Sequence, residues 1–347
     1  MDAFLTATFQ TLPLPVLLLV IIGSILVLGK AADVLVDEAV SLSTRWGVPK
    51  MIIGATIVSL GTTLPEVSVS VLSALEGNPG IALGNAVGSI ICDTGLILGI
   101  AILISPPDID KRLVNRQGWI QVLSGFLLVF AALPWSNLTS VFSTGGRIDQ
   151  GTGFVFLLLL AVYIYLSIRW SRSKPGELEA GIDDTTEYDS APFWIVFLKL
   201  VAAITFVILS SKVLIPSVQE TAVRLSIPDS IIGATLVAFG TSLPELVTAI
   251  QASRRGHSEL AVGNIIGADI LNVLFVSGAA AAVTKNGLEA PVSFFTFYFP
   301  SMLIVLILFR LGIVLSKDKI KRPFGVFLLF HFTSLPLPQD LYLKGNL

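Results

Sequence analysis

Two segments of the chain place a glutamate directly after a proline within a long apolar stretch. The first ends in Pro65 and Glu66, the second ends in Pro244 and Glu245, and they lie 179 residues apart. An ionisable side chain in an apolar helix is energetically costly and by default indicates a function. Proline also removes a backbone N–H and displaces the carbonyl four residues before it, which frees oxygen atoms beside each carboxylate. Hard cations bind such oxygens, so the pair predicts a cation site.

The repeated segments run from Gly54 to Glu66 and from Gly233 to Glu245, and nine of their thirteen positions are identical. A proline kink alone can simply shape helix packing, with nearby hydroxyls bonded back to their own helix. A buried glutamate in both copies favours a site at the interface of two repeats instead. The hydroxyl groups available to that site belong to Thr62, Thr63, Thr241 and Ser242.

A second pair of segments recurs with the same spacing, at 84–93 and 263–272. Their small residues suit a close approach of two helices, which is sufficient reason for the glycines. Ser89 and Asp93 are four residues apart and share one helix face, and Asn272 occupies the place of Asp93 in the second copy. Asp269 lies three residues before Asn272, and it either faces the same site or pairs elsewhere.

The composition is that of a membrane protein. The 347 residues are 54% hydrophobic and 13% charged, with a mean hydropathy of +0.85, whereas soluble domains carry about 25% charged residues. One cysteine and two histidines leave no disulfide framework and no zinc cluster, and no basic stripe argues for nucleic acid. The first thirty residues lack the basic region of a cleaved signal peptide, so we expect a first spanning helix there.

Apolar runs near the roughly 20 residues that span a bilayer recur along the chain. The sequence predicts ten helices, at about 13–40, 51–75, 80–104, 118–135, 152–170, 193–215, 230–252, 259–283, 291–315 and 323–342. We expect an all-α integral membrane protein of two five-helix repeats, at 1–170 and 192–347. An acidic cytoplasmic linker at 171–191 would join them.

An odd number of helices per repeat gives the repeats opposite polarity in the membrane, so they are expected to be inverted. If the N-terminus lies outside, the cytoplasmic loops hold fourteen lysines and arginines, against five in the opposite loops and the C-terminal tail. Because basic loops stay in the cytoplasm, the sequence predicts both termini outside. In a prokaryote this multi-pass protein would lie in the plasma (inner) membrane.

Together, the two pairs of segments resemble the two α-repeats of the calcium/cation antiporter superfamily, the sodium/calcium exchangers. The resemblance rests on Gly-Thr-[Thr/Ser]-Leu-Pro-Glu and Gly-Asn-x-x-Gly-[Ser/Ala] in both halves, and the chain looks like a prokaryotic-type ten-helix member. It implies a central site in which Glu66 and Glu245 match the family's calcium-binding acids. The further ligand positions that it implies are the hydroxyls of Thr62, Thr63, Thr241 and Ser242, the carbonyls of Ser59 and Ala238, and the side chains of Ser89, Asp93 and Asn272.

The chain departs from the family pattern in the second pair of segments. Ala268 stands where a serine ligand is usual, and Asp269 stands where asparagine is usual, which makes Asp269 an additional candidate ligand. Relatives often carry the acid of the last pair in the second repeat, but here it is Asp93 in the first repeat, with Asn272 opposite. This exchange keeps the number of carboxylates and leaves potassium dependence open.

The resemblance implies secondary active transport, with Na⁺ exchanged for Ca²⁺ by alternating access, and neither enzyme activity nor a cofactor. Glu66 and Glu245 neutralise one Ca²⁺, and Asp93 brings the charge to three, enough for three Na⁺ or protons. The first and sixth helices are expected to move against the rest. The expected partners are lipid and inorganic cations, and a monomer suffices for transport because both repeats lie in one chain.

Three alternatives remain. The coupling ion is H⁺ if the buried carboxylates exchange protons. A passive cation channel would need a continuous pore and usually several subunits, whereas an internal inverted repeat favours alternating access. An intramembrane enzyme is disfavoured, because the chain holds neither Gly-x-Ser-x-Gly nor His-Glu-x-x-His.

Overall fold

The computed structural model describes residues 2–75, 77–107, 111–171, 192–225, 241–316 and 319–334. In the first half the elements are α1 (Asp2–Thr11), α2 (Leu14–Trp46), α3 (Lys50–Ile53), η1 (Gly54–Val58), α4 (Ser59–Thr62), α5 (Leu64–Leu75), α6 (Pro79–Cys92), η2 (Asp93–Ile97), α7 (Leu98–Ile104), α8 (Lys111–Ala132), η3 (Leu138–Ser140), α9 (Val141–Thr144), β1 (Gly146–Ile148) and α10 (Gln150–Ser171). In the second half they are α11 (Phe193–Arg224), α14 (Leu243–Arg254), α15 (Ser258–Leu271), η6 (Asn272–Ser277), α16 (Gly278–Val283), β2 (Leu288–Ala290), η7 (Phe294–Tyr298), α17 (Phe299–Leu315) and α18 (Arg322–Ser334).

These elements form the all-α membrane fold that the sequence predicts. Six described helices are long and apolar enough to cross a membrane, and the bent α3–α5 segment makes a seventh candidate. The first repeat comprises α2, α3–α5, α6–α7, α8 and α10; the second comprises α11, the segment ending in α14, α15–α16, η7–α17 and α18. The linker at 172–191 and the residues at 226–240 lie outside the described residues, so the predicted domain boundary stays a prediction.

The first helices of the two repeats run antiparallel, as inverted repeats require. The ring of Trp46, at the end of α2, lies 5.8 Å from the ring of Phe193, at the start of α11. At the opposite end, the Arg224 guanidinium donates hydrogen bonds to the carbonyls of Phe9 and Gln10, just before α2 begins (3.0 and 2.9 Å). The end of each helix therefore lies beside the start of the other.

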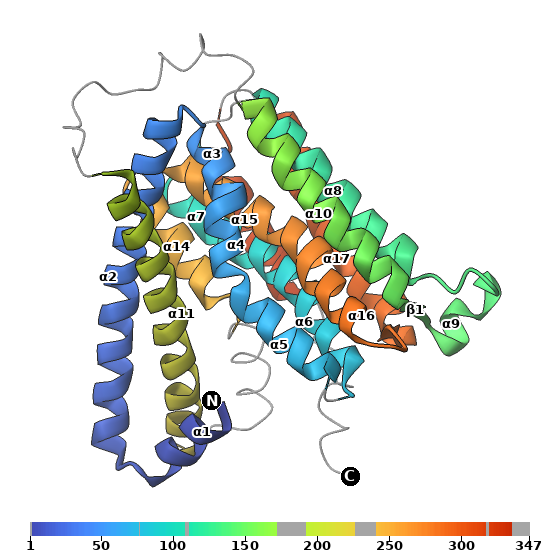
Figure 1. Cartoon of the computed structure of the whole chain (residues 1–347), viewed down its shortest axis with the longest axis horizontal. Helices are drawn as coiled ribbons and strands as arrows, with labels where there is room; N and C mark the ends of the chain where they lie inside the picture. The colour runs from blue at the N-terminus through green and yellow to red at the C-terminus, as the bar shows by residue number, and fades with distance from the viewer. Residues whose placement is uncertain are drawn as a thin grey trace.

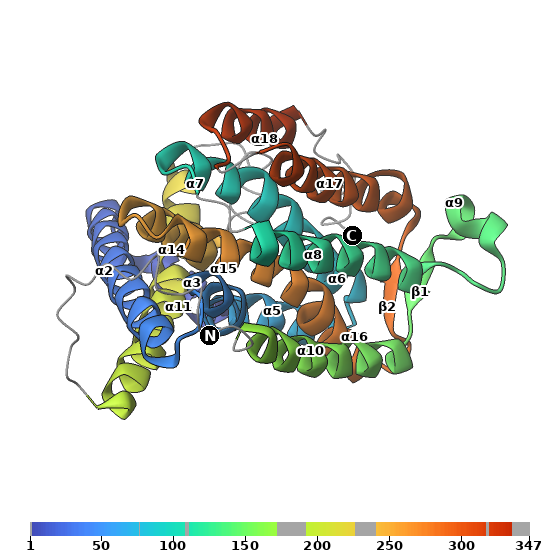
Figure 2. The same cartoon turned by 90° about the horizontal axis from the view of Figure 1, so that it is seen from above.

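α2 and α11 form a pair that stands to one side of the remaining helices (Figures 1 and 2). Both are longer than predicted: α2 continues to Trp46 and α11 to Arg224, because Pro216 is accommodated within α11. Most of their apolar surface faces outward: in the most apolar 18-residue stretch of each helix, only 17% of the residues of α2 and 28% of those of α11 are buried. We call α2 and α11 the outer pair and the other helices the core.

Within the core, η1 crosses α15 at backbone contact. A Cβ on Gly54 would lie 2.5 Å from the Leu260 carbonyl oxygen, and one on Gly267 would lie 2.5 Å from the Ala55 Cα. On Gly263 a Cβ would overlap the Met51 carbonyl. The small residues of the repeated segments therefore have the packing role that the sequence predicts for them.

Two short features were not predicted. The first is α1, which precedes the first span. The second is an antiparallel ribbon of β1 and β2, in which Arg147 lies opposite Glu289, beside α9 at the end of the molecule (Figure 2). With three residues per strand, the ribbon is too short to leave an alternating pattern in the sequence.

The close packing of α3 and η1 against α15 predicts that a methyl group added there destabilises the protein, whereas one added on α2 does not. Gly263→Ala forces the two backbones apart and should lower the free energy of unfolding by about 1–3 kcal/mol. Gly23→Ala, in α2, is the control, because a Cβ there meets nothing within 4 Å. Thermal unfolding of the purified variants in detergent measures both, and equal stability of the two would contradict the crossing.

Candidate cation-binding site

The first glutamate sits just beyond a bend in the first repeat. The helix axis turns by 44° between α4 and α5, and the backbone stays hydrogen-bonded through the bend, with the Thr63 N–H donating to the Ser59 carbonyl (2.9 Å). A Cβ on Gly61 would lie 2.5 Å from Ile204 of α11, so the absence of a side chain at Gly61 lets α11 pack close to the bend. Glu66 lies in the first turn of α5 and is only 1% exposed.

The second glutamate holds the matching place. Glu245 lies in the first turn of α14, is 1% exposed, and follows Pro244. The carbonyl of Ser242 accepts the N–H of Leu246 (3.0 Å) where α14 begins. Ala238 lies outside the described residues, so its predicted carbonyl ligand stays a prediction.

The repeats exchange equivalent hydrogen bonds. The Thr62 hydroxyl of the first repeat donates to the Asn264 side-chain oxygen of the second (3.4 Å). Thr241 of the second repeat donates to the Asn85 side-chain oxygen of the first (3.1 Å). Each threonine and each asparagine lies 179 residues from its counterpart, so the two contacts are related by a pseudo-twofold axis. A further contact between the repeats joins the Thr63 hydroxyl to a Glu245 carboxylate oxygen (3.4 Å).

Asp93 and Asn272 open the two matching π-helical turns, η2 and η6. Single π-helical turns within α-helices are rare and often occur at functional sites. Both side chains are buried, and an oxygen of each has no hydrogen-bond partner among the described residues. The predicted ligands Asp93 and Asn272 therefore lie at equivalent places in the two repeats.

Several buried oxygens of the predicted site lack a protein partner within the described part of the chain. They are Glu66 Oε1 and Oε2, Glu245 Oε2, Asp93 Oδ1, Asn272 Oδ1, Ser242 Oγ and Asp269 Oδ1. Glu66 lies close enough to Glu245 and Asp93 for mutual electrostatic repulsion. Buried polar atoms are normally paired, so this concentration of unpaired acceptors is what a cation-binding centre requires.

No three acidic, histidine or cysteine side chains of the described residues converge with the spacing of a metal site. A cation here would consequently be held by carboxylates mixed with hydroxyl, amide and carbonyl oxygens. Ser89 and Ser59 are both buried and contribute to this polar environment. The Ser59 carbonyl accepts the Thr63 N–H (2.9 Å) and, more weakly, the Thr62 hydroxyl (3.4 Å), so an ion there would compete with the hydroxyl.

Asp269 turns toward a different set of partners. One of its carboxylate oxygens accepts hydrogen bonds from the Thr94 hydroxyl and the Gln121 side-chain amide. Its counterpart in the first repeat is Ile90, and the counterpart of Thr94 is Val273, so this cluster occurs once. The other oxygen, Asp269 Oδ1, is buried without a partner among the described residues, so Asp269 stays a candidate ligand as well as a member of this cluster.

Four polar residues in or beside the site were not among the predicted ligands. Asn85 and Asn264 join the repeats, and the 179-residue repeat is a signal that identifies them. Asn85 also donates to the Ser70 hydroxyl (3.0 Å). Thr94 and Gln121 have no repeat counterpart of the same kind, so nothing in the sequence alone marks them.

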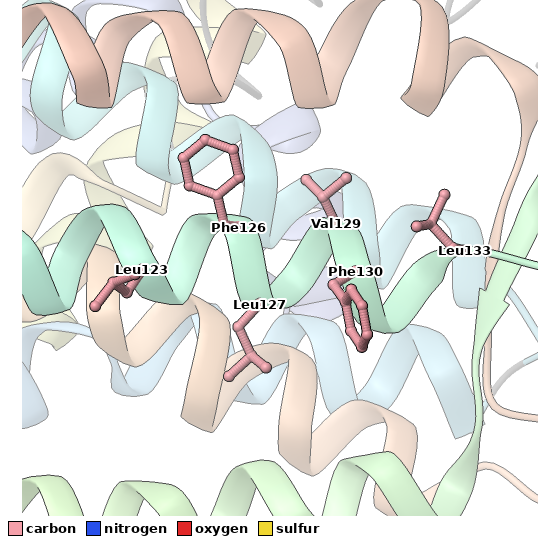
Figure 3. A pocket seen from close by; sticks show the side chains of 6 residues that line it. All are labelled: Leu123, Phe126, Leu127, Val129, Phe130 and Leu133. Carbon is pink, nitrogen blue, oxygen red and sulfur yellow. The ribbon is translucent and has the colours of Figure 1, made fainter. Parts of the chain in front are cut away.

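A surface hollow on α8 provides no ligand atoms (Figure 3). It has a volume of about 480 Å³, and the side chains that line it are all apolar. The side chains that line it are Leu123, Phe126, Leu127, Val129, Phe130 and Leu133. Such a surface suits lipid tails and has no oxygen ligands for a cation. The candidate site is therefore at the buried acids and not at this hollow.

The Asp269 cluster gives a testable result on stability. Gln121→Leu leaves a buried carboxylate oxygen without one of its donors and should destabilise the protein by about 1–3 kcal/mol. Adding Asp269→Leu removes the stranded group and should recover part of the loss. Thermal unfolding of both variants checks this, and an additive second loss would contradict the pairing.

Comparison with known proteins agrees with this geometry. The family model described as "Sodium/calcium exchanger protein" matches residues 16–169 and 195–334. The inner membrane protein YrbG of Escherichia coli is 33% identical over 84% of this chain and 87% of its own length. The sodium/calcium exchanger MaX1 of Methanosarcina acetivorans is 28% identical, over 91% and 96%.

The fold also matches a solved structure. The sodium-calcium exchanger NCX_Mj, soaked with 2.5 mM Na⁺ and 10 mM Sr²⁺, superposes with a TM-score of 0.75 at 25% identity. The match covers 92% of this chain and 98% of that chain. The inverted repeats, the matched acids and these similarities lead to one conclusion: the chain belongs to the sodium/calcium exchanger protein family, whose members are membrane transporters and not enzymes.

Proposed function

We propose that the chain exchanges Ca²⁺ for Na⁺ across the membrane by alternating access at the buried acids. The observation that carries this proposal is the set of unpaired carboxylate oxygens on Glu66 and Glu245, at matched points of two inverted repeats. An acid buried in a membrane protein without a protein partner is stabilised by a bound cation, and the matched positions of the two acids in inverted repeats support transport. The name of MaX1 as a sodium/calcium exchanger supports the same choice of ions.

The proposed ligand set has the chemistry that Ca²⁺ prefers, six to eight oxygen atoms of mixed type. Glu66 and Glu245 supply carboxylates at the centre, and Asp93 and Asn272 supply an acid and an amide from η2 and η6. The remaining proposed ligands are the hydroxyls of Thr62, Thr63, Thr241, Ser242 and Ser89, and the carbonyls of Ser59 and Ala238. Asp269 is a further candidate, because its Oδ1 has no partner among the described residues while Thr94 and Gln121 hold its other oxygen.

Charge explains how one site couples two ions. Two carboxylates balance one Ca²⁺, and three carboxylates balance three Na⁺. A site that holds either load, but not both, exchanges one for the other as it is exposed to each side in turn. The outer pair is the natural moving part, because it packs along one side of the core and Gly61 allows it to lie close to the bend.

Exchange of Ca²⁺ for protons is the second candidate. The same unpaired oxygens that would bind Na⁺ are able to bind protons, because a buried carboxylate readily takes one. The putative antiporter CaxA of Alkalimonas amylolytica, 31% identical over 90% of this chain, carries a name that does not specify the ion. Imposed gradients separate the two candidates.

The orientation follows from the loop charges. We propose that both termini lie outside and that the acidic linker at 171–191 lies in the cytoplasm. Each chain contains both repeats and hence a full set of proposed ligands, so a monomer surrounded by lipid is the expected working unit.

The ligand assignment predicts the effect of removing each carboxylate charge. In proteoliposomes loaded with Na⁺, Glu66→Gln and Glu245→Gln should each lower the initial rate of radioactive Ca²⁺ uptake at least about tenfold, which corresponds to about 1.4 kcal/mol of lost binding. Glu289→Gln changes an exposed acid in β2 and serves as the control. Undiminished uptake by both site variants would refute the assignment.

The coupling ion is tested on the wild-type protein. Ca²⁺ uptake should require an outward Na⁺ gradient and persist when a proton ionophore collapses the pH difference. Uptake that needs only a pH gradient and proceeds without Na⁺ would select proton coupling. An imposed K⁺ gradient, tested separately, reports on potassium dependence.

A further inference from the structure

An arginine of the core contacts two acids of the outer pair. Arg255 caps the C-terminal end of α14, and its guanidinium forms ion pairs with Asp33 and Asp37 of α2. The Asp33 pair measures 3.6 Å, and the guanidinium also donates to the Asp33 backbone carbonyl (3.3 Å). One cation thus contacts α2 at two positions that are four residues apart, on the same helix face.

These contacts lie at the end of α14 that is farther from Glu245. Arg255 follows Glu245 by ten residues, which is about 15 Å along a helix. The same end holds the turn before α15 and the start of α3, where the proposed topology places the cytoplasm. A weaker contact in the same interface joins the Gln251 amide to the Gly29 carbonyl (3.4 Å).

The neighbouring charged groups have partners of their own. Lys50 pairs with Glu259 (3.6 Å) and contacts the His257 ring (3.3 Å). Burial lowers the pKa of His257, and the nearby Lys50 and Arg255 lower it further, so the ring adds no positive charge at neutral pH. Within the outer pair, Glu38 contacts Lys199 (3.1 Å). Arg255 is therefore the described cation that pairs with Asp33 and Asp37.

We propose that Arg255 is an ionic gate that holds the cytoplasmic end of the path closed by occupying Asp33 and Asp37. This inference rests on the alternating-access function proposed above, because α2 is the moving part and Arg255 belongs to the core. When α2 moves away, the pairs separate and the two carboxylates line the opening. There they attract hydrated Ca²⁺ or Na⁺, so the gate arginine and the entering cations compete for the same acids.

The strength of these contacts suits a reversible gate. Partly exposed ion pairs are individually weak, so they bias an equilibrium without locking it. Two pairs on one guanidinium shift the ratio of closed to open molecules by about two- to thirtyfold. Because the pairs are partly exposed, high salt should weaken the bias.

The gate is tested with charge variants of the full-length protein. Arg255→Gln should raise hydrogen exchange in α2 peptides around Asp33 and Asp37 by about two- to thirtyfold. Arg255→Lys keeps the charge and should remain near wild type. The matched control is Arg254→Gln, which removes the same charge from the neighbouring exposed residue of the same helix end.

A charge exchange separates gating from simple structural support. Arg255→Glu and Asp37→Arg should each open the interface, and the double variant should return exchange toward the wild-type rate. Arg255→Gln should also change the apparent KM for Ca²⁺ at the cytoplasmic face more than at the outer face. Hydrogen exchange requires no transport, so it stands even if the transported ions are other than proposed.

Two outcomes would overturn the gate. One is equal exchange in the Arg255→Gln and Arg254→Gln variants. The other is a double charge variant that remains as open as the single variants, with unfolding temperatures that show all of them to be folded.

Discussion

The backbone contact between η1 and α15 is the constraint on which the site depends. Gly54, Gly263 and Gly267 carry no Cβ, so the bent segment of one repeat lies directly against a helix of the other. That proximity places Thr62 beside Asn264 across the repeat axis. Side chains at this contact would separate the repeats, and the acids would no longer share one centre. The close packing therefore serves the chemistry as well as stability.

The same crossing explains how the fold tolerates buried acids. Leaving a carboxylate oxygen without a partner in a low-dielectric interior is costly, and the protein does so at equivalent points of both repeats. An ion that binds between the repeats compensates both at once. In the proposed mechanism, loss of the ion would restore the repulsion among Glu66, Glu245 and Asp93, which would favour taking up another cation before the site changes sides.

The departures from symmetry are as informative as the repeat itself. Asp93 faces Asn272 at matched π-helical turns, so the third charge belongs to one repeat only. Asp269 adds a fourth buried acid, held by Thr94 and Gln121 with no equivalent in the other half. The outer pair, by contrast, follows the repeat closely, since α2 and α11 run antiparallel over most of their length.

Sequence reasoning predicted the parts of this fold that repeat. The acids, the hydroxyls beside them and the inverted topology all follow from one 179-residue spacing and from helix length. It did not predict the partners of Asp269, because Gln121 lies far away in the sequence and meets Asp269 only through tertiary packing. The pairing of Arg255 with Asp33 and Asp37 was also missed, since charged residues at helix ends usually just face water. The ends of α2 and α11 were underestimated because polar residues near their termini resemble loops.

The central claim is that one buried site holds either Ca²⁺ or Na⁺. Equilibrium Ca²⁺ binding to the purified protein, measured by calorimetry at increasing Na⁺ concentration, tests it most directly. The account predicts that Na⁺ weakens Ca²⁺ binding with a steeper than first-power dependence, and that Glu66→Gln abolishes this competition. Ca²⁺ affinity that stays constant as Na⁺ rises, with both ions bound together, would contradict it.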